Sequence, residues 1–346
     1  VPSVAVAGMT PTSRPWVAST GPLTVTVSPL TFEYSVSVGA TTWLANGSVA
    51  IQCEGHRYSS LAGNLTGGKS KILNGSEPAR GVYIAIQRDW TAATCRMTTS
   101  IRKYQRGGIE FVTSISAHGA DGTATEQKLR TSGTTTATEF PSFALPKGPT
   151  SPGLLTWHGN SLRGMTIHLP EPADFGVWVG GLEGGPLLFF SEAPAGGLTS
   201  VVLGPSSQFK AAIITRVRDR LVAGVQGMVT ALPPHYNIRF ALAGSAEGIT
   251  AGMVAYGGML RTAHGTRDTK LTLKDDPLSR ATHYTNDGGS LLNYCDYWVR
   301  RHSPTRVRAA CPTWAAYECS RMNSNPSHLG HSHSHSHPHS REPKCT

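Results

Sequence analysis

The segment at residues 282–298, THYTNDGGSLLNYCDYW, concentrates aromatic, amide and carboxylate side chains in a short stretch. Asn286 and Asp287 precede two glycines, and Tyr284 and Tyr294 lie on either side of them. An Asn-Asp-Gly sequence is typical of a tight turn between two strands, in which case the aromatic residues belong to a core. The alternative is a binding loop whose acidic and amide groups contact a ligand.

Histidines alternate with serine and proline near the end of the chain, at His331, His333, His335, His337 and His339. Neutral imidazoles at this spacing can chelate zinc, copper or nickel from a flexible chain. The alternative is a solvated low-complexity tail, since the sequence indicates no second shell that would orient metal ligands. We predict no cofactor for the rest of the chain.

Two features favour a secretory route. Sequons for N-glycosylation begin at Asn46, Asn64 and Asn74, in a region rich in Gly, Ser and Thr. Cys53 and Cys95 each adjoin a predicted strand, and we expect them to form a disulfide if the protein is secreted. The sequence therefore predicts a secreted glycoprotein, with chance occurrence of the sequons as the alternative.

Composition and charge exclude other classes of protein. The 346 residues are 39% hydrophobic, which suffices for a buried core. The net charge is +10, but residues 300–346 hold seven Lys and Arg against two Asp and Glu, and no basic run accompanies the remainder. We therefore expect no nucleic-acid partner. No apolar run reaches the length of a membrane helix, and the sequence does not predict an oligomeric state.

Apolar and polar residues alternate at period two over much of residues 20–240, for example in LTVTVSPLTFEYSVSV at 23–38. The pattern indicates around ten strands without intervening amphipathic helices. Since an open sheet of that width would curl or split, we predict a large antiparallel β-sandwich. Four tryptophans in or beside the strands are expected in the core: Trp43, Trp90, Trp157 and Trp178.

The period changes to that of a helix between residues 244 and 265, and we predict one helix at about 247–263. Its apolar positions are Ile249, Met253, Tyr256 and Leu260. Ser245 is a candidate cap at its start, and Gly265 is a candidate stop. The internal glycines indicate close packing: Gly252, Gly257 and Gly258.

The order of a wide sandwich, a glycine-rich helix, a polar connector and an acidic aromatic turn resembles glycoside hydrolases of the α-galactosidase and α-glucosidase superfamily. The resemblance is carried by HYTNDGGSLLNYCDYW at 283–298, FPSFALP at 140–146 and GVQGMVTALPP at 224–234, and it covers roughly residues 20–298. It implies an N-terminal β-supersandwich that leads through a helical linker into a catalytic (β/α)8 barrel.

The resemblance implies a sugar site at the first strand-to-loop corner of a barrel. Tyr284 or Tyr294 would then stack on a pyranose face, and Asn286 and Asp287 would hydrogen-bond its hydroxyls. The order Thr285-Asn286-Asp287 departs from the Thr-Asp-Asn order of the related motif. The acid is shifted by one position, so a catalytic residue is not assigned.

A (β/α)8 barrel needs about 200 residues or more, whereas 48 residues follow Trp298. We therefore expect a sandwich domain at 1–244, a helical linker with the start of a barrel at 245–299, and a disordered basic tail at 300–346. The predicted function is that of a glycoside-hydrolase-like protein without most of its barrel, carbohydrate-related and inactive alone. The alternatives are a secreted carbohydrate-binding or cell-surface module, and an intact hydrolase with a hidden site.

Overall fold

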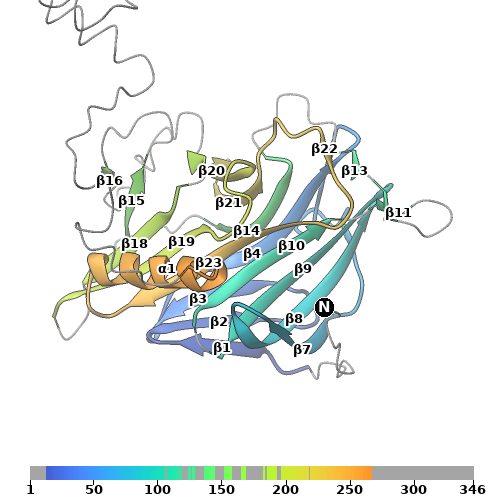
Figure 1. The fold of residues 1–346 in the computed structure, drawn as a ribbon. Coiled ribbons are helices and arrows are strands. Elements are labelled where there is room, and N and C mark those ends of the chain that lie inside the picture. The colour runs from blue at the N-terminus through green and yellow to red at the C-terminus, as the bar shows by residue number, and fades with distance from the viewer. Residues whose placement is uncertain are drawn as a thin grey trace, which may run out of the picture. The chain divides into compact units, whose positions relative to one another are not determined.

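The computed structural model describes residues 13–266 apart from 106, 116, 119–123, 126, 129–135, 145–151, 158–164, 169–181, 184, 193–195 and 218. These residues form two large antiparallel sheets and one helix, which confirms the predicted sandwich (Figure 1). The sandwich and its helix belong to one compact unit, Val1–Asp268. Within the described residues no helix has the length and apolarity to cross a membrane.

The first sheet has nine strands, and β5 pairs with β4 beside the main order. In spatial order its strands are β1 (Trp16–Thr20), β2 (Leu23–Val27), β3 (Tyr34–Val38), β4 (Thr41–Cys53), β14 (Thr138–Ala144), β21 (Arg220–Val225), β20 (Ala212–Val217) and β17 (Leu182–Glu183), with β5 at His56–Ser59. Strand β14 lies between β4 and β21, so the sheet joins segments that are far apart in the sequence.

The second sheet has ten strands, and β7 pairs with β8 beside the main order. Its strands are β16 (Met165–His168), β15 (Gly153–Trp157), β18 (Leu187–Glu192), β19 (Leu198–Pro205), β23 (Tyr236–Ser245), β10 (Ile109–Ile115), β9 (Cys95–Tyr104), β8 (Gly81–Ala92) and β6 (Thr66–Gly67), with β7 at Lys71–Glu77. Two small ladders pair β11 (Ala117–His118) with β12 (Ala124–Thr125) and β13 (Gln127–Lys128) with β22 (Ala231–Leu232).

The core lies between the two sheets. Strand β2, LTVTV, alternates buried and half-buried residues, as period-two patterning requires of a strand with one face inward. Aromatic side chains fill the centre, where Tyr34 packs edge-on against Phe140 and Phe143. Burial raises the pKa of the Tyr34 hydroxyl, which donates a hydrogen bond to the Ser48 carbonyl.

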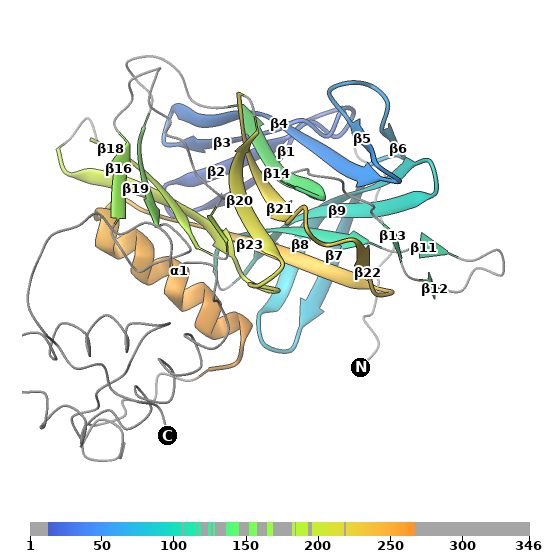
Figure 2. The ribbon, with the colours of Figure 1, turned by 90° about the horizontal axis from the view of Figure 1, so that it is seen from above.

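Helix α1, Ile249–Ala263, packs on the outer face of the ten-stranded sheet over β19 and β23 (Figures 1 and 2). The sheet residues beneath it are Leu155, Leu188, Val202, Ala241 and Ala243, which alternate with residues of the main core. Where α1 covers them, strands β15, β18, β19 and β23 are therefore apolar on both faces, because one face meets the other sheet and one meets α1.

The predicted helix is confirmed, but two details of its sequence analysis are wrong. The residue before the helix is Gly248, at φ 99°, and the Ser245 hydroxyl instead accepts a hydrogen bond from the Glu247 amide. Of the three internal glycines only Gly252 packs closely, since a Cβ there would lie 2.2 Å from the Ser200 hydroxyl. A Cβ at Gly257 or Gly258 would meet nothing within 4 Å.

The predicted stop at Gly265 agrees with the structure. Its φ of 63° is in the left-handed region, which favours glycine, and its amide donates to the Thr262 carbonyl. Beyond the predicted strands, the structure adds β1 before residue 20 and extends β23 to Ser245. The apolar segment FGVWVGG at 175–181, within the region that is predicted to form strands, lies outside the described residues.

Candidate functional site

The residues predicted to bind sugar, Tyr284, Asn286, Asp287 and Tyr294, lie outside the described residues. So do the five alternating histidines that were predicted to chelate metal: His331, His333, His335, His337 and His339. Among the described residues, no group of three or more His, Cys, Asp or Glu side chains is arranged to hold a metal ion. Trp43 and Trp90 are buried, as expected of core residues. The candidate site therefore has to be built from other side chains.

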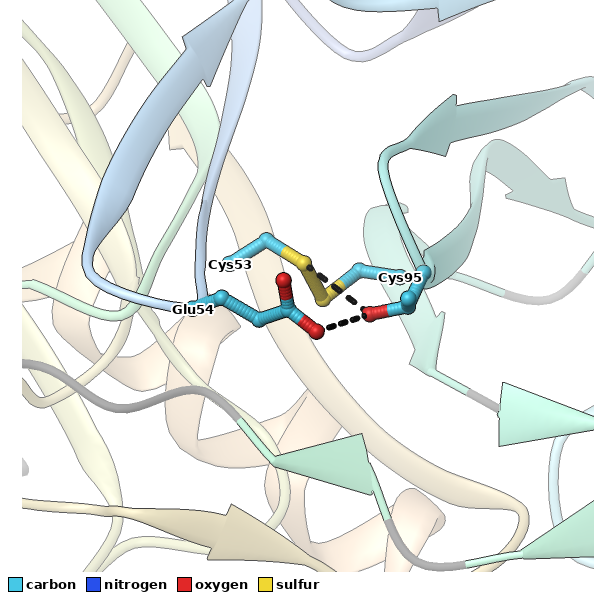
Figure 3. The surroundings of a disulfide bond; sticks show 4 residues. Cys53, Glu54 and Cys95 are labelled. Carbon is cyan, nitrogen blue, oxygen red and sulfur yellow. Dashed lines mark hydrogen bonds between the residues drawn. A yellow bond between two sulfur atoms is a disulfide. The ribbon is translucent and has the colours of Figure 1, made fainter.

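Cys53 and Cys95, which the sequence analysis expects to pair, form a disulfide that joins the two sheets. Cys53 ends β4 in the nine-stranded sheet, and Cys95 begins β9 in the ten-stranded sheet. Next to it, Thr94 donates a 2.8 Å hydrogen bond to the Glu54 carboxylate (Figure 3). Disulfides are typical of extracellular and secretory-pathway proteins, so the bond supports that localisation.

A charged cluster lies on the outer face of the ten-stranded sheet, next to the end of α1. We define it as Glu77 at the end of β7, Arg80 in the following turn, Arg102 and Tyr104 on β9, Glu110 on β10 and Arg239 on β23. Three arginines and two glutamates give it a net charge of +1. Strand register explains the location: Arg102 pairs with Glu110, whereas the next residue, Phe111, points into the core.

Glu77 is held by three arginines. Arg102 Nη1 lies 2.6 Å from Oε1, and Arg239 Nη1 and Arg80 Nη1 lie 2.8 and 3.1 Å from Oε2. Burial by itself raises the pKa of this carboxyl, but the hydrogen bond from Arg239 and the charges of the three arginines outweigh it and hold the pKa at about 2. Glu77 therefore stays ionised at neutral pH and cannot act as a proton donor there.

Glu110 is the more deeply buried acid, with a side chain that is 2% exposed. The Ser206 hydroxyl donates to it over 2.8 Å, and the Tyr104 hydroxyl lies 3.2 Å from an oxygen of each carboxylate. Arg80 Nε is 3.3 Å from Glu110 Oε1 but does not make a hydrogen bond in this geometry. Both carboxylates thus contact cationic and hydroxyl partners, as in a structural ion network. Burial raises the pKa of the Tyr104 hydroxyl, so this group stays protonated at neutral pH.

A hollow of about 330 Å³ lies beside the cluster, between α1 and the sheet. Small residues line this space, among them Ala255 and Gly258 on the helix and Gly244 on β23, and a Cβ at Gly258 would meet nothing within 4 Å. A second, much smaller hollow of about 20 Å³ reaches Arg80, Tyr104 and Glu110. Both are lined by Gly107, Gly108, Met259 and Thr262, so the cluster and the larger hollow share a wall.

The sides of the larger hollow combine hydroxyls with an apolar surface. Thr20 Oγ1 donates to the Gly107 carbonyl over 3.3 Å, and Thr262 Oγ1 donates to the Gly258 carbonyl over 2.9 Å. Each hydroxyl keeps lone pairs with which it can accept a hydrogen bond from a ligand. The Met259 thioether supplies an adaptable apolar surface, and it approaches Gly108 so closely that a Cβ there would lie 2.3 Å from the sulfur.

Sequence analysis missed this site. A weak signal exists at Glu110, a carboxylate inside the otherwise apolar and hydroxyl-bearing strand IEFVTSI, where a buried charge requires a partner. Glu77 and Arg80 also flank a hairpin turn, a common position for an ion pair. The partners Arg102 and Arg239 come from 25 and 162 residues beyond Glu77, and no local pattern indicates them.

We expect acid to weaken the fold through Glu77. Because its folded-state pKa of about 2 lies below the ordinary value of 4.5, its stabilising contribution is fully present above about pH 5 and is lost as the pH falls towards 2. The free energy of unfolding should drop by roughly 2 to 3 kcal/mol from this group. Urea unfolding at about pH 6 and pH 2.5 measures the drop, and Glu77→Gln should show a smaller one. An equal drop in both proteins would contradict the assignment.

No family model matches the sequence, and no curated protein matches it. The structure is similar to solved structures of glycoside hydrolases. For a variant of a Glycoside Hydrolase Family 97 enzyme from Pseudoalteromonas sp. strain K8, the TM-score is 0.41 at 11% identity, over 65% of this chain and 34% of that one. For a quadruple mutant of the alpha-N-acetylgalactosaminidase NagBb from Bifidobacterium bifidum, the TM-score is 0.42 at 11% identity, over 72% of this chain and 39% of that one.

This chain therefore spans little more than a third of the length of the solved structures that it matches. The matched region is the N-terminal portion of those enzymes. Similarity at this level does not assign an activity, and what the chain resembles is a portion of glycoside hydrolases.

Proposed function

We propose that the described part of the chain is a non-catalytic carbohydrate-binding unit, and that the hollow beside α1 takes one sugar residue. The main observation in support is the set of side chains that line this hollow. It offers the hydroxyls of Thr20 and Thr262 next to the apolar surface of Met259, and its volume of about 330 Å³ is within the range of small-molecule sites. A pyranose presents the same combination of hydroxyls and apolar C–H faces.

The charged cluster supports a non-catalytic role for this unit. Glycoside cleavage requires one carboxyl group that donates a proton and a second that acts as base or nucleophile. Glu77 stays ionised because its pKa is about 2, and Glu110 is engaged by Ser206, Tyr104 and Arg239. The two acids that the described fold brings together therefore fix the sheet and the adjoining wall of the hollow.

Two glycines of α1 provide a matched test. Gly258 lines the hollow and Gly257 does not, and a side chain has room at both positions. Gly258→Leu should occupy part of the hollow and lower sugar affinity by at least tenfold, whereas Gly257→Leu should leave it unchanged. Both substitutions should raise helix propensity, by about 1 kcal/mol each, so a folding defect would not mimic the effect.

The measurement is a titration of the chain with neutral hexoses, N-acetylhexosamines and short oligosaccharides, followed by calorimetry or NMR shifts. Equal affinity of the two leucine variants, or no binding of any sugar, would contradict the proposed site. Release of the aglycone from aryl α- or β-glycosides would contradict the non-catalytic role. Asp287→Asn then tests whether the predicted sugar-site acid carries that activity.

A further inference from the structure

The hairpin of β7 and β8 leaves an apolar surface uncovered. Residues of β8 alternate along its length, and Val82, Ile84 and Ile86 share one face. Ile86 is fully buried in the core, whereas Val82 and Ile84 are 52% and 50% exposed. The sandwich thus covers only part of this face of the hairpin. The side chains of Val82 and Ile84 lie beyond the covered part and contact solvent.

Strand β7 is also a sheet edge. It pairs with β8 in register from Lys71↔Gln87 to Glu77↔Gly81, and β8 pairs with β9 on its other side. Among the described strands, none pairs with the second side of β7, which lies at the margin of the sheet in Figure 1. The five residues between Lys71 and Glu77 carry no charge. An uncharged edge next to exposed aliphatic residues is a template for pairing with another chain.

Asn74 lies in the middle of this edge. It is exposed, it begins the sequon Asn74-Gly75-Ser76, and its register partner is Ile84. Residues directly opposite in an antiparallel pair project from the same face, so Asn74 emerges beside the exposed aliphatic residues. Its side chain makes no hydrogen bond within the described part of the chain. The Asn64 side chain differs. Its Oδ1 accepts a hydrogen bond from the Ser59 N–H, and its Nδ2 donates one to the Arg57 carbonyl.

We propose that Asn74 carries an N-linked glycan that covers Val82 and Ile84 and blocks strand pairing at β7. The donor is a lipid-diphosphate-linked oligosaccharide of the secretory pathway. A bond forms between Asn74 Nδ2 and the anomeric carbon, the bond from that carbon to the diphosphate oxygen breaks, and the lipid diphosphate leaves. The amide nitrogen loses one proton, so the step needs no oxidant or reductant.

The first test is glycopeptide mapping of the chain secreted from a eukaryotic host. A glycan is expected on the peptide that contains Asn74, and Ser76→Thr, which keeps the sequon, should keep it. Asn74→Gln and Ser76→Ala should each remove it. Secreted protein with unmodified Asn74 would overturn the proposal.

The second test asks whether the glycan blocks association. An endoglycosidase that leaves one sugar residue, applied to the folded wild-type protein, avoids any effect of the glycan on folding. Light scattering of the trimmed protein, and of Asn74→Gln, should show at least a doubling of the average mass. Ile84→Lys added to Asn74→Gln places a charge on the exposed face and should restore the original mass.

A matched control removes a different sequon. Thr66→Ala abolishes the sequon at Asn64 without changing the Asn64 side chain, and Thr66 is exposed. We expect its mass in solution to equal that of the wild type. The covering role would be overturned if the trimmed protein and Asn74→Gln kept the wild-type mass. It would also be overturned if Thr66→Ala associated in the same way.

Discussion

Replacing Arg239 by methionine is expected to lower the free energy of unfolding by about 3 to 5 kcal/mol, because it leaves charges buried without their partner. The Arg239 side chain is 15% exposed, and its guanidinium reaches both acids of the cluster, Glu77 over 2.8 Å and Glu110 over 3.5 Å. Burial opposes its charge, but the hydrogen bond and charge of Glu77 raise its pKa overall. Methionine keeps most of the volume of the side-chain stem and removes the charge.

Lys71→Met is the control for this substitution, because it removes a cation of the same sheet from an exposed ion pair. Lys71 Nζ lies 3.1 Å from Asp89 Oδ2, and the two side chains are 53% and 50% exposed. Solvent screens such a pair, so the cost should stay below about 1 kcal/mol. Denaturant unfolding at neutral pH measures both variants, and similar losses in the two would contradict a special role for the cluster.

A double-variant cycle isolates the coupling between Arg239 and Glu77. Glu77→Gln should cost less in the Arg239→Met background than in the wild type, because Arg239 no longer has that carboxylate as partner. We expect an interaction energy of about 1 to 3 kcal/mol, as for contacting residues of one network. Strictly additive costs would show that the 2.8 Å contact contributes nothing to stability.

The Cys53–Cys95 disulfide is the second feature with a large expected effect. The cysteines are 42 residues apart, and closing a loop of that length is expected to stabilise the fold by about 4 kcal/mol through the entropy of the unfolded chain. Cys53→Ala combined with Cys95→Ala should lower the free energy of unfolding by that order. The bond also links the two sheets, so its loss should reduce the yield of secreted protein.

Reduction of the wild-type protein provides an independent measurement of the same quantity. Unfolding of the reduced wild type and of the double alanine variant should give similar free energies, because both lack the covalent link. Both cysteines are buried, so part of the loss in the variant comes from the two sulfur atoms. A loss below about 1 kcal/mol in both would contradict the stabilising role.

Local patterning accounts for what the sequence predicts well. The alternation in residues 23–38 predicts strands with one buried face, and the structure has β2 and β3 there. The region predicted to form strands also contains β9, Cys95–Tyr104, and the period of 3.6 after residue 247 corresponds to α1. These features depend on neighbouring residues, whose side chains are placed by the geometry of a single strand or helix.

The candidate site depends on tertiary structure. Arg239 meets Glu77 because the sheet order runs from β23 through β10, β9 and β8 to β7, where Glu77 lies. The hollow exists because α1 crosses β23 next to Gly107 and Gly108, a neighbour relation between segments more than a hundred residues apart. The sequon at Asn74 is visible in the sequence, but its location on a sheet edge opposite Ile84 is not.

The sequence by itself determined the class of fold, the helix and the alternation of buried and exposed residues, because each is set by the period of one local segment. Only the tertiary structure decided which strands are neighbours, and therefore which charges meet and where space remains beside α1. Strand order and register depend on backbone pairing and on how the sheets bury their apolar faces together, and many orders satisfy the same local alternation.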